Sequence, residues 1–298
     1  MIHCLGEALV DLICERPVRS PAEADSFVPH FGGALANVAV AVARAGAPAG
    51  LAGAAGDDAW GRWLHERLAA ERVDLRFFDL APGSQTPVAF ATVSPEGEPS
   101  FEIYGEAIAD ALDLIGPRVD ALAEASEALV FGSTTLAERG EREVTDGARA
   151  AALERGVRVC FDPNIRPNRW RGEVERAHAA SRERVPGCYL VRANQDEAMA
   201  ITGAADPAAA AEALAALGAT LAVVTLGPEG ALMRGACEAE APAPEVELVS
   251  SIGAGDAFMG TLVAELHRRE WRTESAGEAL APALAAAAEA CTHWSAIA

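Results

Sequence analysis

The strongest constraint on the fold of this chain is a regular alternation of short apolar runs with longer helix-like segments. Strands that alternate with helices of this length form βαβ units, and such units build a mostly parallel sheet. Strand-like runs occupy residues 2–10, 49–55, 73–80, 86–94, 127–132, 157–161, 188–192 and 220–226. Helix-like runs occupy residues 33–45, 58–71, 140–155, 173–184, 194–202, 206–218, 255–270 and 275–292. We therefore predict an α/β fold with helices on both sides of a central sheet.

Two segments, approximately 13–30 and 85–105, interrupt this alternation, because they carry proline, glycine and short alternating runs without a helical pattern. The second predicts a hairpin with strands over 87–93 and 100–104 and a turn over 94–98. We expect these strands to form a small sheet that acts as a lid, inserted in a single domain over residues 1–298. An exposed lid edge could also pair with a second copy of the chain to give a homodimer.

Charge excludes several classes of protein. The 298 residues carry a net charge of −20, so a nucleic-acid interface, which needs clustered positive charge, is not expected. The sequence contains no lysine, and its basic side chains other than histidine are all arginine. A Walker A phosphate loop, a protein-kinase site and a pyridoxal enzyme each require a lysine, so the sequence excludes all three.

Cysteine and histidine give no sign of a metal or redox centre. The six cysteines lie far apart without a C-x-x-C pair, and no H-E-x-x-H motif is present. Charged residues and proline interrupt every apolar stretch before it reaches membrane-spanning length, and the first residues lack the pattern of a signal peptide. We therefore expect a cytoplasmic protein with reduced thiols and no membrane contact.

The segment 250–258 carries the clearest functional signal, because Gly253-Ala254-Gly255-Asp256 stands at the start of a predicted helix. Such a turn lets successive backbone N–H groups point one way, and the helix N-terminus adds its positive dipole end. An anion would then be held without a cationic side chain. Asp256 could take a proton from a substrate hydroxyl beside this anion site. A structural interpretation is equally open, in which Asp256 caps the helix and the glycines only make a tight turn.

Three other polar loops follow predicted strands directly. They occupy residues 161–164, 193–197 and 225–230. Each has a local structural interpretation as a turn or a helix cap. Open α/β sheets bind ligands at the carboxyl ends of their parallel strands, so the joint placement of the three loops favours a ligand site.

A further candidate site lies near the N-terminus, where Gly32 and Gly33 open a helix-like run. Two glycines permit close approach of the backbone to a small polar ligand. Asn37 follows on an otherwise apolar helix, where an unpaired amide would be costly to bury, so a ligand hydroxyl is a credible partner. Asp11, at the end of the first predicted strand, is a second acceptor for hydroxyl groups. A hydrogen-bonded structural role for Asn37 remains the alternative.

The motifs that carry a resemblance are, in order, Gly32-Gly33-x-x-x-Asn37, Asp162-Pro163-Asn164, Asn194-x-x-Glu197, Thr225-Leu226-Gly227 and Gly253-Ala254-Gly255-Asp256. Together they resemble the ribokinase-like (pfkB) carbohydrate kinases, and fructokinase-like members in particular. The resemblance covers about residues 2 to 292. It implies a three-layer sandwich with a β lid, and ATP-dependent phosphorylation of a sugar or nucleoside hydroxyl with Mg²⁺.

The same resemblance implies roles for single residues. Asp256 would be the catalytic base, with an anion hole formed by Gly253, Ala254 and Gly255. The implied sugar-binding residues are Asp11, Gly32, Gly33, Asn37 and Arg166, the last in a D-P-N-x-R pattern. The implied ATP-site residues are Asn194, Glu197, Thr225 and Gly227, with Glu197 also acting on Mg²⁺ through water.

The chain departs from the family pattern at three places. Many members have an acid at the position of Ser250 that helps to hold a monovalent cation, so serine disfavours potassium activation here. Fructokinase-like members often have an arginine after the lid hairpin, where this chain has Tyr104-Gly105-Glu106. Its absence favours a neutral sugar over a sugar acid. Residues 293–295 replace a basic, glycine-containing end, which alters the edge of the implied adenine pocket.

Several functions remain open at this point. A fructose-like sugar is the preferred substrate, and 2-keto-3-deoxygluconate, ribose or a nucleoside are the alternatives on the same fold. A non-catalytic sensor of sugar or nucleotide would use the same residues. A nicotinamide-dependent oxidoreductase is disfavoured, because the first strand runs into residues 6–11 without a G-x-G-x-x-G motif.

Overall fold

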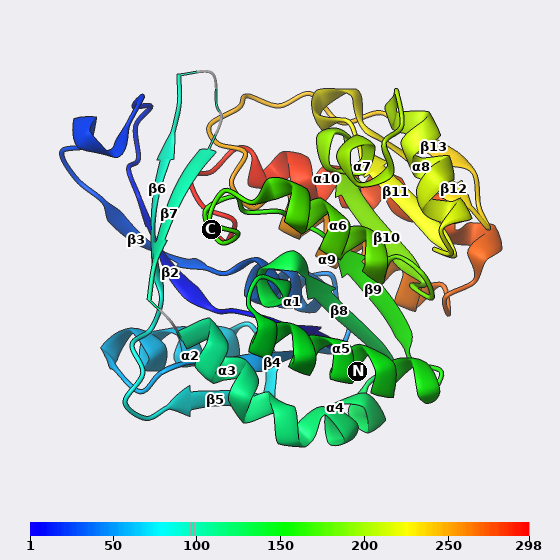
Figure 1. Ribbon diagram of the computed structural model, residues 1–298. Coiled ribbons are helices and arrows are strands. Elements are labelled where there is room, and N and C mark those ends of the chain that lie inside the picture. Colours follow the sequence, from blue (N-terminus) through cyan, green and yellow to red (C-terminus); the bar gives the residue numbers. More distant parts are fainter. Residues whose placement is uncertain (96, 98, 106, 298) are drawn as a thin grey trace.

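The computed structural model describes residues 1–95, 97, 99–105 and 107–297, and its centre is a nine-stranded sheet (Figure 1). The strand order is β13-β12-β11-β10-β9-β8-β1-β4-β5, with β12 and β13 antiparallel and the other neighbours parallel. The strands are β1 (Ile2–Leu5), β4 (Ala49–Gly56), β5 (Asp74–Ala81), β8 (Ala128–Gly132), β9 (Arg158–Asp162), β10 (Leu190–Asn194), β11 (Leu221–Thr225), β12 (Ala231–Gly235) and β13 (Ala239–Ala241). The predicted mostly parallel α/β sheet is confirmed.

Helices cover both faces of this sheet because its strands are apolar on both sides. Side chains such as Leu190 and Val191 alternate between two separate buried clusters, one on each face. One face carries α1 (Ala34–Arg44), α2 (Ala59–Ala70), α9 (Ala254–Arg268) and α10 (Leu280–Ala290). The other carries α3 (Ala107–Ile115), α4 (Val119–Ala125), α5 (Arg139–Glu154), α6 (Val174–Arg184), α7 (Gln195–Thr202) and α8 (Pro207–Ala216).

Helices α1 and α9 approach each other closely at Gly260. A Cβ atom at this position would lie 2.6 Å from the carbonyl oxygen of Val38 and 2.5 Å from the Cβ of Ala41. Those distances are shorter than van der Waals contact, so the two helices could not pack this way around a larger side chain. The N-terminal turn of α9, which carries the Gly-Ala-Gly-Asp motif, is thereby fixed against α1.

A second, four-stranded sheet stands beside the main one, at the left of Figure 1. Its strand order is β3-β2-β6-β7, formed by β2 (Leu9–Ile13), β3 (Val28–Gly32), β6 (Val88–Val93) and β7 (Pro99–Tyr104). The small sheet and its β6–β7 hairpin are therefore as predicted, although Glu96 and Glu98 of the predicted turn lie outside the described residues. Its inner side packs Ile13 and Ala91 against Ile252 and Trp294.

The prediction of a single strand over residues 2–10 is wrong. The chain forms β1 in the main sheet, leaves it at Gly6, and then forms β2 in the small sheet. An apolar run carries no signal for the point at which a strand changes sheet, because both sheets bury it equally. As a consequence, the small sheet begins at Leu9, before the predicted segment 13–30, and Asp11 lies within β2 instead of ending the first strand.

Other differences are local. Helices α3 and α4 and the edge strands β12 and β13 were not predicted, and each of these elements is short. The helix predicted over 275–292 begins as the 3₁₀ segment η5 (Thr273–Ala279) and becomes α-helical only at Leu280. Among the described residues no helix is long and apolar enough to cross a membrane, and the six cysteines are unpaired.

Candidate active site

The candidate site lies where the order of the main sheet reverses. From β1 the chain adds β4 and β5 on one side and β8 to β11 on the other, so a topological switch point lies between β1 and β8. Ligands of open α/β sheets bind at such points, beyond the carboxyl ends of the strands. A small cavity of about 40 Å³ is found here, and its polar lining includes Glu7, Asp11, Asn37, Arg166 and Asp256. Four separate parts of the sequence, residues 7–11, Asn37, Arg166 and Asp256, therefore meet at one place.

Asp256 is buried in the first turn of α9, with 5% of its surface exposed. Its two carboxylate oxygens accept hydrogen bonds from the amides of Asn37 (2.9 Å) and Asn164 (3.2 Å). Burial raises the pKa of Asp256 to about 6, against the opposing effects of Arg166 and the Asn37 hydrogen bond. A carboxylate with a pKa near neutrality, held by two amides at the edge of a cavity, is suited to accept a proton.

The turn before Asp256 presents free backbone donors. Gly253 is left-handed (φ 78°) and packs so closely on Ala296 that no side chain could be accommodated. The N–H groups of Gly255 and Asp256 donate to no acceptor within the described part of the chain, whereas the N–H of Ala254 donates to the Ser251 carbonyl (3.3 Å). The free donors at the helix N-terminus can hold an anion. Of the predicted anion-hole residues, Gly253 and Gly255 have N–H groups without an acceptor in the described part of the chain, and the N–H of Asp256 is a further free donor.

The predicted sugar-binding residues lie around the same small cavity. Asp11 is buried in β2 with its carboxylate packed on Gly32, and burial raises its pKa to about 8, with Arg166 opposing the shift. Gly33 (φ 101°) begins α1 and approaches the backbone of residues 7 and 8. Asn37 is buried one turn later, and its Oδ1 has no hydrogen-bond partner among the described residues.

Arg166 connects the cavity with the small sheet. Its guanidinium lies over the ring of Phe101 in β7, 5.1 Å from the centroid. In the same loop, Asn168 donates to the carbonyl oxygen of Phe101 (2.8 Å). Ser251, just before α9, donates to the carbonyl oxygen of Gly97 (3.2 Å). The small sheet is therefore fastened over the cavity, which has room for only a few water molecules.

Glu7 was not predicted as a site residue. It lies between β1 and β2, where its carboxylate accepts hydrogen bonds from the Thr134 hydroxyl (2.7 Å) and the Ala34 N–H (3.1 Å). An acid within an otherwise apolar run was the available signal, because a buried carboxylate needs hydrogen-bond donors or a ligand. Phe101 was likewise missed, since nothing in the hairpin sequence distinguishes it from a packing residue.

A larger cavity of about 560 Å³ lies on the other side of the α9 N-terminus. Predicted residues Thr225 and Gly227 line it, together with Gly255 and apolar side chains that include Val246 and Leu284. Arg192 of β10 also lines this cavity and was not predicted. The signal for Arg192 was a charge in the middle of an apolar strand.

Asn194 and Glu197 line neither cavity. Asn194 caps α7 in a capping box with Glu197, and each side chain accepts the backbone N–H of the other. The second carboxylate oxygen of Glu197 accepts the N–H of Ile165 (2.7 Å), which fixes the loop that carries Asn164 and Arg166. Both oxygens of Glu197 are thus occupied by backbone donors, an arrangement that suits an indirect contact to a metal through water better than direct ligation. No cluster of three metal-ligating side chains is found among the described residues.

Ser250 is fully buried, and its hydroxyl oxygen accepts the N–H of Ile252 (3.1 Å). Serine at this position does not supply the negative charge that a carboxylate would contribute to a monovalent-cation site. The residues present therefore do not fit a potassium site that depends on an acid at this position.

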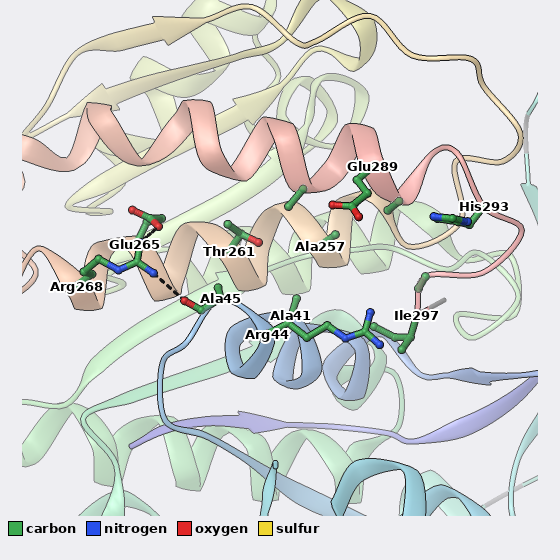
Figure 2. Close-up of a pocket in the computed structure, with 13 residues that line it drawn as sticks. Ala41, Arg44, Ala45, Ala257, Thr261, Glu265, Arg268, Glu289, His293 and Ile297 are labelled. Carbon is green, nitrogen blue, oxygen red and sulfur yellow. Dashed lines mark hydrogen bonds and ion pairs between the residues drawn. The ribbon is translucent and has the colours of Figure 1, made fainter. Parts of the chain in front are cut away.

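A third cavity, of about 520 Å³, lies between α1, α9 and α10 (Figure 2). Its lining includes Thr261 and Glu265 on the face of α9 that turns away from the Asp256 pocket. Glu265 pairs with Arg268 and Arg269, and Arg268 donates to the carbonyl oxygen of Ala45 (2.7 Å). Since this cavity contains neither Asp256 nor the free N–H groups of α9, we assign the site to the other two cavities.

A buried carboxylate beside a helix N-terminus that can hold an anion, between two cavities of an α/β sheet, is the arrangement expected of a phosphotransferase with an alcohol group as acceptor. The model of the pfkB family carbohydrate kinases matches residues 1–298. This chain belongs to that family and is a sugar kinase.

Several characterised proteins are similar to this chain. Aminoimidazole riboside kinase of Salmonella typhimurium is 33% identical over 98% of this chain and 89% of its own length. Fructokinase of Klebsiella pneumoniae is 32% identical over 89% of this chain and 84% of its own length. The structure of a Vibrio cholerae fructokinase variant with fructose, ADP and potassium ion bound is 28% identical, with a TM-score of 0.84, over 99% of this chain and 93% of that one.

Proposed function

We propose that this chain is an ATP-dependent kinase that phosphorylates a hydroxyl of a small neutral sugar, with a fructose-like sugar preferred. The observation that carries the proposal is the position of Asp256 on the small cavity, next to Gly255 on the larger one, with its carboxylate held by Asn37 and Asn164. Similarity to two fructokinases supports the preference for fructose.

The proposed reaction uses the buried carboxylate and the α9 N-terminus together. Asp256 accepts the proton of the acceptor hydroxyl while that oxygen forms a bond to the γ-phosphorus, and the bond from this phosphorus to the ADP oxygen breaks. The free N–H groups of Gly255 and Asp256 stabilise the charge on the transferring group. Asp11 and Asn37 hold the sugar by its other hydroxyls.

The nucleotide is proposed to bind in the 560 Å³ cavity, beside Thr225 and Gly227. Its mostly apolar wall suits the adenine ring of the nucleotide, and Gly255 also lines this cavity. Mg²⁺ would be held by the phosphates and, through water, by Glu197, and it would neutralise phosphate charge. Because Ser250 replaces an acid, we propose that potassium does not activate the enzyme.

The small cavity must enlarge before a sugar can enter. Since the small sheet covers it through Phe101 and Arg166, we propose that this sheet is a lid that opens for substrate and closes before transfer. Closure would exclude water from the phosphoryl group.

A nucleoside is the second candidate substrate. Aminoimidazole riboside kinase is similar to almost the whole of this chain, and the cavity bears three carboxylates against one arginine among its described lining residues. That charge accepts a neutral or cationic substrate and disfavours a sugar acid such as 2-keto-3-deoxygluconate.

ADP release should be measured with fructose, ribose, aminoimidazole riboside, adenosine and 2-keto-3-deoxygluconate as acceptors. We expect the highest kcat/KM with fructose. Highest activity with a riboside would reassign the substrate, and ATP binding without turnover for any acceptor would indicate a sensor.

A further inference from the structure

Arg192 is an unusual residue for the centre of a parallel sheet. It lies in β10 between β9 and β11, and only 8% of its surface is exposed. Its strand neighbours Val191 and Ala193 are fully buried apolar residues. A buried ion is costly to desolvate, and apolar residues of similar volume often serve stability as well or better. Packing alone therefore does not explain an arginine here.

Its guanidinium is held in place by two residues. Nη1 lies 3.2 and 3.4 Å from the carboxylate oxygens of Asp162, and Nη2 donates to the hydroxyl of Thr225 (2.8 Å). The ring of Phe258 lies 5.7 Å away, beneath the guanidinium carbon. The buried Nε finds no acceptor among the described residues. Arginine has five N–H donors in a fixed fork, so these partners leave donor capacity for a further acceptor.

The guanidinium also touches the N-terminal turn of α9. A Cβ atom at Gly255 would lie 2.8 Å from Nη1 of Arg192, so the glycine permits the contact. Within the described lining of the 560 Å³ cavity, Arg192 is the only cation and Glu245 the only anion. The positive charge thus lies in the wall of this cavity, next to Gly255, whose N–H is free to hold an anion.

We propose that Arg192 is a phosphate-contacting residue, which binds the β- and γ-phosphates of the nucleotide beside the α9 N-terminus. The inference rests on the proposed function for the presence of ATP in this cavity. Arginine binds phosphate through parallel charge-assisted hydrogen bonds, and the low dielectric of a buried site strengthens them. In a chain without lysine, Arg192 supplies a cationic side chain beside the helix N-terminus on the side of the larger cavity.

Asp162 gives this arrangement a second property. Its buried carboxylate keeps the guanidinium oriented before the nucleotide arrives, so less side-chain freedom is lost on binding. Asp162 also begins the loop whose Asn164 contacts Asp256 and whose Arg166 reaches the lid. One short segment therefore connects the proposed phosphate site with the candidate base.

The test compares ATP with adenosine, because only ATP carries the groups that Arg192 is proposed to bind. The dissociation constant of ATP is measured by calorimetry without sugar, and that of adenosine by its competition with ADP, so that adenosine bound in the acceptor cavity is not counted. Both are measured for the wild-type chain and Arg192→Gln. We expect the substitution to weaken ATP about 10- to 100-fold, as for loss of a charged hydrogen bond, and to change adenosine less than threefold. A general packing defect would weaken both ligands.

Arg184→Gln is the matched control. Arg184 is another buried arginine paired with a carboxylate, Asp146, but it lies on α6 away from both site cavities. It should lower stability without changing the ratio of the two dissociation constants. If Arg192→Gln does not fold, Arg192→Lys keeps a charge beside Asp162 but loses the fork, and we expect the ratio to fall at least about fivefold.

An unchanged ratio in whichever Arg192 variant folds would overturn the inference. Because the binding is measured without an acceptor, this outcome is separate from the proposed function. A wild-type chain that binds ATP more tightly than adenosine, but phosphorylates no acceptor, would contradict the proposed function and leave the test of Arg192 intact.

Discussion

Replacing Asp256 by asparagine removes the proposed base with almost no change of shape. The two oxygens of Asp256 accept from Asn37 and Asn164, so the new amide keeps one of these hydrogen bonds and turns a donor towards the other. The local structural cost is about 1 kcal/mol, the net value of one hydrogen bond. Sugar and ATP affinity should therefore change little.

The effect on catalysis should be far larger. A positioned base contributes about 10²- to 10⁴-fold to rate, equivalent to roughly 3–5 kcal/mol of transition-state stabilisation. We expect kcat for ADP release with the best acceptor to fall by that factor while KM stays within about threefold. Asp206→Asn, a change of the same chemistry at the N-cap of α8, is the control and should keep wild-type kcat. A kcat within tenfold of wild type in Asp256→Asn would refute the assignment of the base.

The acid limb of the pH profile tests the same residue in the unmodified enzyme. Burial raises the pKa of Asp256 to about 6, and the residue can accept a proton only when ionised. The value of kcat/KM should therefore fall about tenfold per pH unit below pH 6 and level off above it. In Asp256→Asn the residual activity should lose this limb. A flat wild-type profile between pH 5 and 7 would contradict the proposed role.

Three further predictions follow from single contacts. Gly260→Ala should lower the free energy of unfolding in urea by about 1–3 kcal/mol, because its Cβ meets the backbone of Val38. Gly147→Ala, in the interior of α5 with open space around it, should raise the free energy of unfolding by about 0.5–1 kcal/mol. The same sign for both changes would contradict the packing argument. Because the pKa of the buried Asp11 carboxyl is raised to about 8, the folded state loses stability as pH rises from about 4 to 8. The stability of Asp11→Asn relative to the wild type should therefore increase by a few kcal/mol between pH 5 and pH 8.5, and the substitution should weaken sugar binding. A stability difference that does not depend on pH would refute this prediction. Replacing sodium by potassium should change kcat less than twofold, given the neutral, engaged Ser250, and a larger activation would show that another group supplies the cation site.

Much of the fold could be predicted because its signals are local and repeated. Alternating buried strands and capped helices, such as the one that Asn194 and Glu197 begin, need only their own residues to be recognised. The Gly-Ala-Gly-Asp turn was found for the same reason, since the conformation of Gly253 and the start of α9 are properties of adjacent residues.

The remaining features depend on contacts between distant segments. The sequence could not show that the strand containing Ile2 ends at Gly6 and that Asp11 belongs to another sheet, because that depends on which neighbours pair. Nor could it show that Asn194 and Glu197 face the Ile165 loop and line neither cavity. Arg192 was visible as a charge in a buried strand, but its meaning required the approach of Gly255 from 63 positions further along the chain.

The location of Asp11 on β2 has a consequence for how the proposed enzyme avoids wasting ATP. This carboxylate belongs to the small sheet, so under the proposed function a sugar that binds Asp11 would also stabilise the closed position of the lid. A water molecule is too small to connect Asp11 with the main domain in this way, so without a sugar only contacts such as those of Phe101 and Gly97 would hold the lid closed. Hydrolysis of ATP would then be limited by the position of Asp11 on β2, without a separate residue that excludes water.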